Sequence, residues 1–592
     1  MTNQLILRYA RTALGTLLVL FLFVGCATHP ALDVHVVEPL GSDATLESNH
    51  GVLVVRVIDA SSSRLPFNYV TLAPRDLNRS SSIKPFRLSS VSGSTGGSTL
   101  FAVSLPAGHY SVASLLARYS DGDIHYARRV TSTVDLGTFE VVSEGVTDLG
   151  EIVYFPRIQE DRYTDTLIRI PNSSTLSAVK QLVDADVLSA SRIRTWDTDG
   201  RDTERFTQYS SAAQNPVAFN GHYRDHDDNV YFFGKLGVIL IRTPDGNWGM
   251  KAIDSASDMH TMAVSPEGHM AIGGDMGEVH YRPNNGAWRT IEFDPRYSIR
   301  HLYFHNDHTI DVVARTHREI LVFRQTLLEN GEPKRLAYYN SGSGWIDSQG
   351  TAIGLGISNR ANRYNNLTER IGYLRVADMD GTTYLMMSTQ RDGNQSVYSR
   401  HYGNVFTVDR STWALSDGRQ HGTRINYAMN AGQVNLGANR PGALSMRTSN
   451  RYFRLESDTG RWVELASAFD NCADLDLRPG ARECVKDGAR IRRYRSFEFV
   501  STPVFSSPND GLAFVRLSGT STDNRPVLTA VTSDGGGSWQ EAEMDVSPPR
   551  KHCFSTVPEA SDTLLVNCMG ADFFESNDNG KSWRHVRQRQ QF

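Results

Sequence analysis

A tryptophan-containing turn recurs along the second half of the chain and limits the possible folds more than any other feature. The stretches "TSDGGGSW" (Thr532–Trp539) and "SNDNGKSW" (Ser576–Trp583) share one spacing of Ser or Thr, Asp, Gly, Ser and Trp. Looser copies, in which Gly stands two residues before Trp, end at Trp248, Trp288 and Trp462. Because recurrence of this kind indicates repeated supersecondary units, the sequence predicts a repeat architecture.

The residue types in this turn predict that its own side chains stabilise it. An Asp or Ser can accept hydrogen bonds from backbone N–H groups further on, Gly adopts positive φ without steric cost, and the Trp ring can pack beneath the hairpin. The two complete copies resemble the Asp box of the bacterial neuraminidase repeat, S/T-x-D-x-G-x-S/T-W. The resemblance implies a β-propeller of the sialidase type, which can be enzymatic or not, and a purely structural role for Thr532, Asp534, Gly536, Trp539, Ser576, Asp578, Gly580 and Trp583.

The first 25 residues have the organisation of a signal peptide. Two arginines precede an apolar run from about Leu17 to Val24, which is shorter than the roughly 20 residues needed to span a bilayer. The following "FVGC" resembles the bacterial lipobox, in which the Cys is acylated and becomes the new N-terminus. The resemblance implies lipidation at Cys26 and a membrane anchor in the bacterial envelope, and Ala27 after the Cys favours the outer membrane, on either its periplasmic or its surface side.

Four further cysteines remain once Cys26 is set aside: Cys472, Cys484, Cys553 and Cys568. An even number in an exported chain predicts disulfides. Proximity favours pairing the first with the second and the third with the fourth, although other pairings and buried free thiols stay open. The cysteines lack the ligand spacing of a metal site, so we assign no metal.

Composition narrows the fold and function classes. The formal net charge of −4 gives no indication of nucleic-acid binding. Abundant Gly, Ser, Thr and aromatic residues, with few helical periods, predict an all-β protein. No motif in the chain calls for a cofactor.

The chain divides into five predicted parts. After the signal peptide (1–25) and a tether (26–50), short strands from 51 to 156 have the rhythm of a β-sandwich, transthyretin-like or Ig-like. Its "LPAGHY" turn resembles those of transthyretin-like domains, which implies a spacer or adhesion module. A connector with one helix (157–200) then leads to a β-propeller (201–592) with seven candidate blades, six or eight remaining possible.

Two short motifs offer alternative chemistry. "IRIP" at Ile168–Pro171 resembles the F/YRIP motif of sialidases, which implies that Arg169 binds a substrate carboxylate; an exposed strand end is the structural alternative. The acidic turns "DTDGRD" (197–202), "DMDG" (378–381) and "HYRDHDDN" (222–229) are similar to the start of calcium loops, but each lacks the later ligands of a complete site. We therefore interpret them as turns.

The segment from Arg478 to Arg495 gathers seven basic residues around Cys484. Because guanidinium groups suit carboxylate and phosphate partners, this segment predicts a partner-binding surface. Its candidate residues are Arg490, Arg492, Arg493 and Arg495. The alternative is a solvated basic loop balanced by Asp470, Asp474 and Asp476.

Together these features favour a lipid-anchored, non-catalytic module that binds an unknown envelope protein or glycan. A sialidase-like exo-glycosidase using the propeller's central pocket is the alternative. Because no acid, base or nucleophile can be placed by spacing, we assign no catalytic residue.

Overall fold

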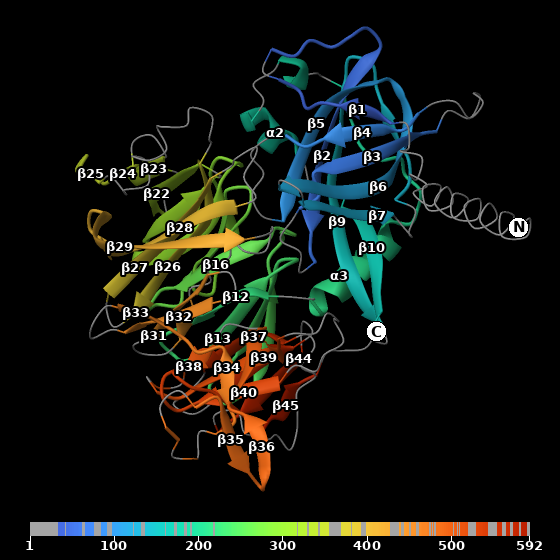
Figure 1. Ribbon diagram of the computed structural model, residues 1–592. Helices are drawn as coiled ribbons and strands as arrows, with labels where there is room; N and C mark the ends of the chain where they lie inside the picture. Colours follow the sequence, from blue (N-terminus) through green and yellow to red (C-terminus); the bar gives the residue numbers. More distant parts are fainter. Residues whose placement is uncertain are drawn as a thin grey trace, which may run out of the picture.

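A computed structural model describes residues 34–588, except for gaps at 76–83, 354–368, 392–397, 427–436, 519–527 and 543–552 and gaps of one to five residues elsewhere. The protein is all-β, as predicted. An N-terminal domain of strands lies beside a ring of sheets (Figure 1). Within these described residues, no helix has the length and apolarity to cross a bilayer. The predicted signal peptide and Cys26 lie outside them.

Two sheets form the N-terminal domain. The first has the order β1-β4-β3-β6-β7, with β8 also paired to β6, and its strands are β1 (His35–Val37), β3 (Tyr69–Pro74), β4 (Phe86–Ser89), β6 (Gly108–Asp121), β7 (Ile124–Thr131) and β8 (Phe139–Val141). The second has the order β10-β9-β2-β5, with β11 also paired to β9, and its strands are β2 (His50–Asp59), β5 (Ser98–Pro106), β9 (Val146–Gln159), β10 (Arg162–Ile170) and β11 (Ile193–Arg194). The second sheet thus continues past Pro156 to Ile170.

Strand β2 is buried on both faces. Leu53, Val55 and Val57 face the first sheet and join one core with residues of β3 and β6. On the other face, Val52 and Val54 pack against α2 (Leu176–Leu182), the predicted connector helix. This explains why the run "VLVVRVI" is almost continuously apolar, whereas a strand with one solvated face alternates.

The connector also holds a short 3-10 helix, η1 (Asp186–Ser189). A second helix, α3 (Asp202–Gln214), follows it within the range predicted for the propeller, whose first strand begins at Phe219. Tyr209 and Ala213 of α3 pack against Ile168 and Phe155 of the second sheet. Helix α3 is therefore fixed to the N-terminal domain.

Seven antiparallel sheets of four or more strands follow one another within the described part of residues 219–587, together with one two-stranded sheet. The first three comprise β12 (Phe219–Arg224), β13 (Val230–Gly234), β14 (Val238–Arg242) and β15 (Trp248–Ala252); β16 (Met259–Val264), β17 (Met270–Gly274), β18 (Glu278–Arg282) and β19 (Arg289–Glu292); and β20 (Ser298–Asn306), β21 (Thr309–Arg315), β22 (Glu319–Thr326), β23 (Lys334–Asn340), β24 (Gly344–Ile346) and β25 (Ala352–Ile353).

The fourth and fifth sheets have four strands each: β26 (Glu369–Met379), β27 (Thr382–Arg391), β28 (Tyr398–Asp409) and β29 (Ala414–Asn426); and β30 (Gly437–Asn439), β31 (Ala443–Thr448), β32 (Arg451–Glu456) and β33 (Arg461–Glu464). The sixth comprises β34 (Ala468–Asp470), β37 (Tyr494–Phe499), β38 (Val504–Phe505), β39 (Gly511–Leu517), β40 (Leu528–Thr532) and β41 (Gln540–Glu541). The seventh comprises β42 (Cys553–Pro558), β43 (Leu564–Cys568), β44 (Asp572–Ser576) and β45 (Arg584–Arg587).

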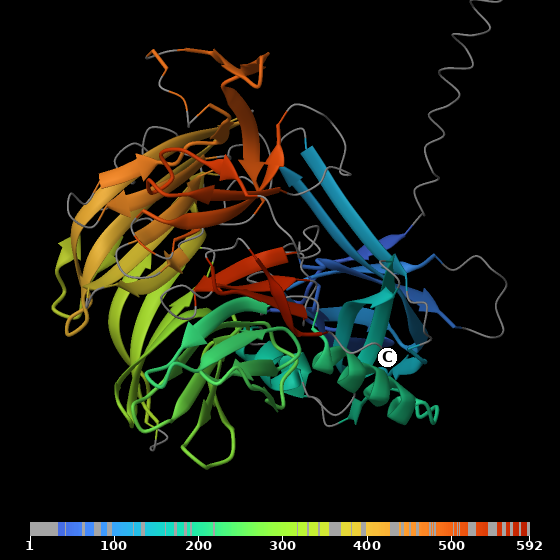
Figure 2. The same ribbon diagram turned by 90° about the horizontal axis from the view of Figure 1, so that it is seen from below.

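The seven sheets close into a ring. One strand of each sheet contacts the equivalent strand of the next, in the order β12, β16, β20, β26, β30, β38 and β42. The first and last sheets then meet through Phe232 and Phe573, whose ring centroids are 4.7 Å apart, and through an ion pair between Arg242 and Glu575. Figure 2 shows the red seventh sheet beside the green first sheet. Radially arranged sheets with sequential inner strands define a β-propeller.

Candidate functional site

A two-stranded hairpin projects from the sixth sheet, away from the body of the molecule (Figures 1 and 2). It consists of β35 (Glu483–Lys486) and β36 (Ala489–Arg492), with Cys484 opposite Ile491. Asp487 and Gly488 form the turn, both with positive φ. This is the conformation that a two-residue hairpin turn requires, and Asp-Gly adopts it readily.

The base of the hairpin is anchored covalently and by ion pairs. A disulfide joins Cys472 to Cys484 across 12 residues, which confirms that predicted pairing. Two of the four candidate arginines also serve this anchor: Arg493 donates to the Asp470 carboxylate at 2.9 and 3.0 Å, and Arg495 pairs with Glu541. The charges of these two arginines are matched within the sixth sheet, and the contact of all four arginines with a partner stays a prediction.

The remaining two candidates, Arg490 and Arg492, are exposed on the hairpin itself. In the antiparallel register Arg490 is opposite Val485 and Arg492 is opposite Glu483, so these four side chains share one face. Val485 is 59% exposed, and Tyr494 at the base is 54% exposed. This face therefore carries two guanidinium groups, one carboxylate and an exposed apolar side chain, with a net positive charge.

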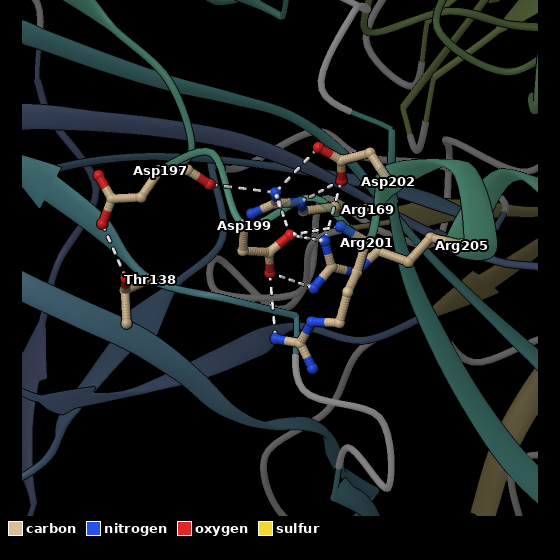
Figure 3. A network of polar contacts seen from close by, with 7 residues as sticks. All are labelled: Thr138, Arg169, Asp197, Asp199, Arg201, Asp202 and Arg205. Atoms are coloured by element: carbon tan, nitrogen blue, oxygen red, sulfur yellow. Dashed lines mark hydrogen bonds and ion pairs between the residues drawn. The ribbon is translucent and has the colours of Figure 1, made fainter.

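The "IRIP" arginine and the first acidic turn meet in one ion-pair network (Figure 3). Arg169 lies at the end of β10 and is only 3% exposed. It donates to Asp202 at 2.8 and 3.1 Å and to the Asp197 carbonyl at 3.1 Å. Arg205 of α3 donates to Asp199 at 2.6 and 2.8 Å.

This network excludes two of the alternative roles. Hydrogen bonds from Arg205 and from Arg169 lower the pKa of Asp199 and of Asp202, respectively, so both carboxylates are ionised and satisfied by guanidinium groups. The turn therefore holds cationic side chains where a calcium loop would hold an ion. Arg169 is neither an exposed strand end nor available to a substrate carboxylate, because it is buried and its Nε and Nη2 donate to Asp202 and to the Asp197 carbonyl.

The acidic turn at 222–229 is also satisfied internally. The Asp225 carboxylate accepts hydrogen bonds from the backbone N–H of Asp227 and Asn229 at 3.0 and 2.8 Å and from the Tyr231 hydroxyl at 2.8 Å. This is the geometry of an Asp-initiated turn. The turn at 378–381 lies partly outside the described residues.

A buried arginine joins the two domains. Arg56, in the middle of β2, places Nη1 3.0 Å from Glu151 of its own domain and 3.0 Å from Glu278 of the propeller. Its Nη2 donates to the Ser257 hydroxyl at 2.6 Å. Burial alone would raise the pKa of Glu278, but the charge of Arg56 together with the contacts of His280 and Ser257 outweighs it, and the pKa falls to about 2. Glu278 is therefore ionised, and it is the propeller residue that pairs with Arg56 across the domain junction.

Two turns of the propeller insert apolar side chains into the N-terminal domain beside this ion pair. Leu236 and Met276 stand between the second and third strands of the first two sheets, and both have positive φ. Leu236 packs against Ile58, and Met276 joins the cluster of Val52. Since positive φ costs a non-glycine residue roughly 1 kcal/mol or more, the burial of these side chains helps to hold the turns in place.

A second polar cluster lies at the same junction. Asp258, His260 and Asp275 bring ligand atoms within 4.8 Å of one another. However, the Lys235 ammonium group contacts Asp258, and the Gly97 N–H of the N-terminal domain donates to Asp275 at 2.8 Å. Donors thus fill the positions that a metal would use, and the cluster acts as a domain contact.

The two tryptophan turns lie between the third and fourth strands of their sheets. In the first, the Ser538 N–H and hydroxyl donate to Asp534 at 2.9 and 2.7 Å, and Gly535 and Gly536 have positive φ. In the second, Ser582 donates to Asp578 at 2.8 and 2.6 Å. Gly580 lies outside the described residues. These turns are at the opposite edge of the sheets from the domain junction, since strand direction alternates.

The second cysteine pair is partly described. Cys568 is disulfide-bonded and lies opposite Cys553 in the register of β42 and β43. The Cys553 side chain lies outside the described residues, so this pairing stays a prediction.

Comparison with known proteins adds limited information. No family model and no curated protein matches the chain. Similar solved structures include "YCF48 bound to D1 peptide" (14% identity, 60% of this chain and 91% of that chain, TM-score 0.31) and "Structure of Dos1 propeller" (10%, 63% and 85%, TM-score 0.35). A polysaccharide lyase of the ulvan lyase family is similar at 11% identity, over 64% of this chain and 94% of that chain, with TM-score 0.33. Because these TM-scores are below 0.5, we base the propeller assignment on the strand topology above.

Proposed function

We propose that the protein is a non-catalytic binding or assembly module of the bacterial envelope, with the basic hairpin β35-β36 as its contact surface. The seven sheets act as seven blades that carry the hairpin, and the two N-terminal sheets act as a β-sandwich spacer between the propeller and a lipid anchor at Cys26. The partner is an envelope protein or glycan that presents anionic groups.

The observation that carries this proposal is the projecting, disulfide-anchored hairpin with Arg490 and Arg492 exposed. A rigid anchor lowers the entropy lost when a loop binds. Exposed arginines suit carboxylate, sulfate and phosphate groups. The matched pairs of Arg493 and Arg495 support the hairpin without contributing free charge.

The double change Arg490→Gln and Arg492→Gln is expected to reduce capture of an anionic envelope partner at least tenfold and to weaken its salt dependence. Surface charges are screened within about 8 Å at physiological ionic strength, so removing them removes that dependence. The measurement is a pull-down from envelope extract at low and moderate salt, followed by direct titration of each recovered partner.

A double variant with the same charge change, Arg289→Gln and Arg318→Gln, is the control, because both residues are exposed elsewhere on the propeller. Both variants should keep the wild-type stability within about 0.5 kcal/mol. Equal partner yields for the wild type and the hairpin variant would contradict the proposal.

The anchor has its own test. Cys26→Ser is expected to leave the protein soluble or with its signal peptide uncleaved, because the lipobox is the only membrane-directed feature of the sequence. Detergent-phase partitioning and the mass of the mature N-terminus measure this. A wild-type protein found in the aqueous phase would overturn the anchor and leave the hairpin proposal standing.

A further inference from the structure

Equivalent arginines end the third strand of the first two propeller sheets. Arg242 is the last residue of β14, and Arg282 is the last residue of β18. Each donates a hydrogen bond to the carbonyl of the glycine in the turn that follows, Gly246 at 3.5 Å and Gly286 at 3.2 Å. Each also lies over the ring of the tryptophan that ends this turn, with Cζ 5.4 and 5.9 Å from the ring centroid. The repeat therefore contains two copies of one arrangement that can be compared.

The two arginines differ in the residue that each meets from the preceding sheet of the ring. Arg242 forms an ion pair with Glu575 of the seventh sheet, whose side chain is buried. Arg282 instead meets a second cation, Lys251 of the first sheet. The Nζ of Lys251 and the Nη1 of Arg282 lie 3.9 and 3.8 Å from one atom, the Sδ of Met270, and a thioether is only a weak acceptor. Among the described residues, neither cation has a carboxylate partner.

Both cations face the boundary between the first and second sheets. On β15, Lys251 is opposite Ile239, which belongs to the core between these two sheets. On β18, Arg282 is opposite Met270, which belongs to the same core. Opposite residues of an antiparallel pair share a face, so the two cations approach this boundary from its two sides. Both side chains are half-buried, so solvent reaches them.

A glycine leaves space beside Lys251. Gly249 is two residues earlier on β15, so it is on the same face of the strand. A Cβ atom added at Gly249 would have one neighbour within 4 Å among the described residues, the Cβ of Ile241 at 4.0 Å. A glycine inside a strand often marks a place where a ligand or another backbone comes close.

We propose that Lys251 and Arg282 bind one oxyanion group at the boundary between the first and second sheets, in the space beside Gly249. The ligand is a small molecule or a sugar that carries a carboxylate, sulfate or phosphate group. It takes the place that the Glu575 carboxylate has beside Arg242. Arg282 uses Nε for its turn, so its Nη groups face the ligand, and Lys251 supplies a compact charge. The site is separate from the hairpin β35-β36, so either proposal can fail alone.

The electrostatics of Lys251 agree with this arrangement. Burial and the positive charge of Arg282 lower the pKa of Lys251. A nearby like charge disfavours the charged form of a group, and an opposite charge favours it. A bound anion would therefore relieve the repulsion between the two cations.

The test titrates the full-length protein with glucuronate, sulfate and phosphate at constant ionic strength and follows binding by calorimetry. We expect saturable binding of at least one anion, and the strongest of the three identifies the oxyanion class. Lys251→Gln should weaken this binding at least tenfold, because one of the two charges is lost. Arg289→Gln is the charge-matched control and should bind within twofold of wild type. Arg289 is exposed and is opposite Tyr281, which packs on the side of the third sheet.

Two substitutions at Gly249 test the position of the site. Gly249 does not have positive φ, so the strand accommodates a side chain there. Gly249→Asp adds a carboxylate beside Lys251 and should weaken binding at least tenfold, whereas Gly249→Ala adds only a methyl group and should bind within threefold of wild type. Thermal melting shows whether each variant is folded. Absence of saturable binding by all three anions, or unchanged binding in folded Lys251→Gln or Gly249→Asp, would overturn the proposal.

Discussion

Replacing Arg56 by Ala is expected to lower the free energy of unfolding by about 3 to 5 kcal/mol, the usual cost of removing one partner from a buried ion pair. Arg56 is 6% exposed and contacts two carboxylates, Glu151 and Glu278, from two domains. Without the guanidinium group, both carboxylates stay buried with less compensation. Burial already raises the pKa of Glu151 even in the presence of Arg56, so this residue is the first to be protonated in the variant.

Chemical denaturation followed by circular dichroism measures this loss. Arg289→Ala, an exposed arginine on β19, is the matched control and should change stability by less than about 0.5 kcal/mol. A partial rescue is expected when Glu278→Gln is combined with Arg56→Met, because the pair is then replaced by neutral groups. A loss of less than 1 kcal/mol in Arg56→Ala would show that the domain junction does not depend on this residue.

Trp539→Ala is expected to destabilise the propeller by about 3 to 5 kcal/mol, the range found when a buried aromatic side chain is removed. Trp539 is fully buried, and its ring centroid lies 5.6 Å from that of Phe499. The same core includes Tyr452 of the fifth sheet, so the cavity would weaken the contact between two sheets.

Thermal and denaturant unfolding provide the measurement. Trp288→Ala is a suitable comparison, because Trp288 ends a looser copy of the turn and is only half-buried. It should lose clearly less stability than Trp539→Ala. Equal and small losses in both variants would show that the tryptophan turns do not hold the sheets together.

The features that local sequence encodes could be predicted. Both complete tryptophan turns depend on side chains within eight residues, such as Asp534 and Ser538, so their spacing alone indicated the turn. The all-β class followed from composition and strand rhythm, and the Cys472 to Cys484 pairing followed from proximity.

The contacts between distant segments could not be predicted. Arg169 meets Asp199 and Asp202 only because α3 folds back onto β10, and no spacing rule places a helix there. The sequence around Arg56 did contain one signal that could have predicted a buried ion pair. A single arginine inside the apolar run "VLVVRVI" implies a buried charge with a partner, since an unpaired charge is not tolerated in such a strand. The partner, Glu278, is 222 residues away.

In the basic segment from Arg478 to Arg495, too, the sequence did not reveal the contacts with distant residues. Its sequence gives seven positive charges, but only the fold decides which are matched. Arg493 and Arg495 meet carboxylates on β34 and β41 of the sixth sheet, whereas Arg490 and Arg492 lie on the separate hairpin β35-β36.

The seam between the first and last sheets has a consequence for how the molecule is made. Within the part of the chain that the structure describes, each sheet is built from one continuous stretch, and side chains such as Phe232 and Phe573 hold the seam. Their partners are separated by more than 300 residues, as Arg242 and Glu575 show. During synthesis the ring must stay open until the strands of the seventh sheet arrive. A chain cut short before Phe573 would leave the aromatic face of the first sheet uncovered, which is a mark that quality-control proteases and chaperones can detect.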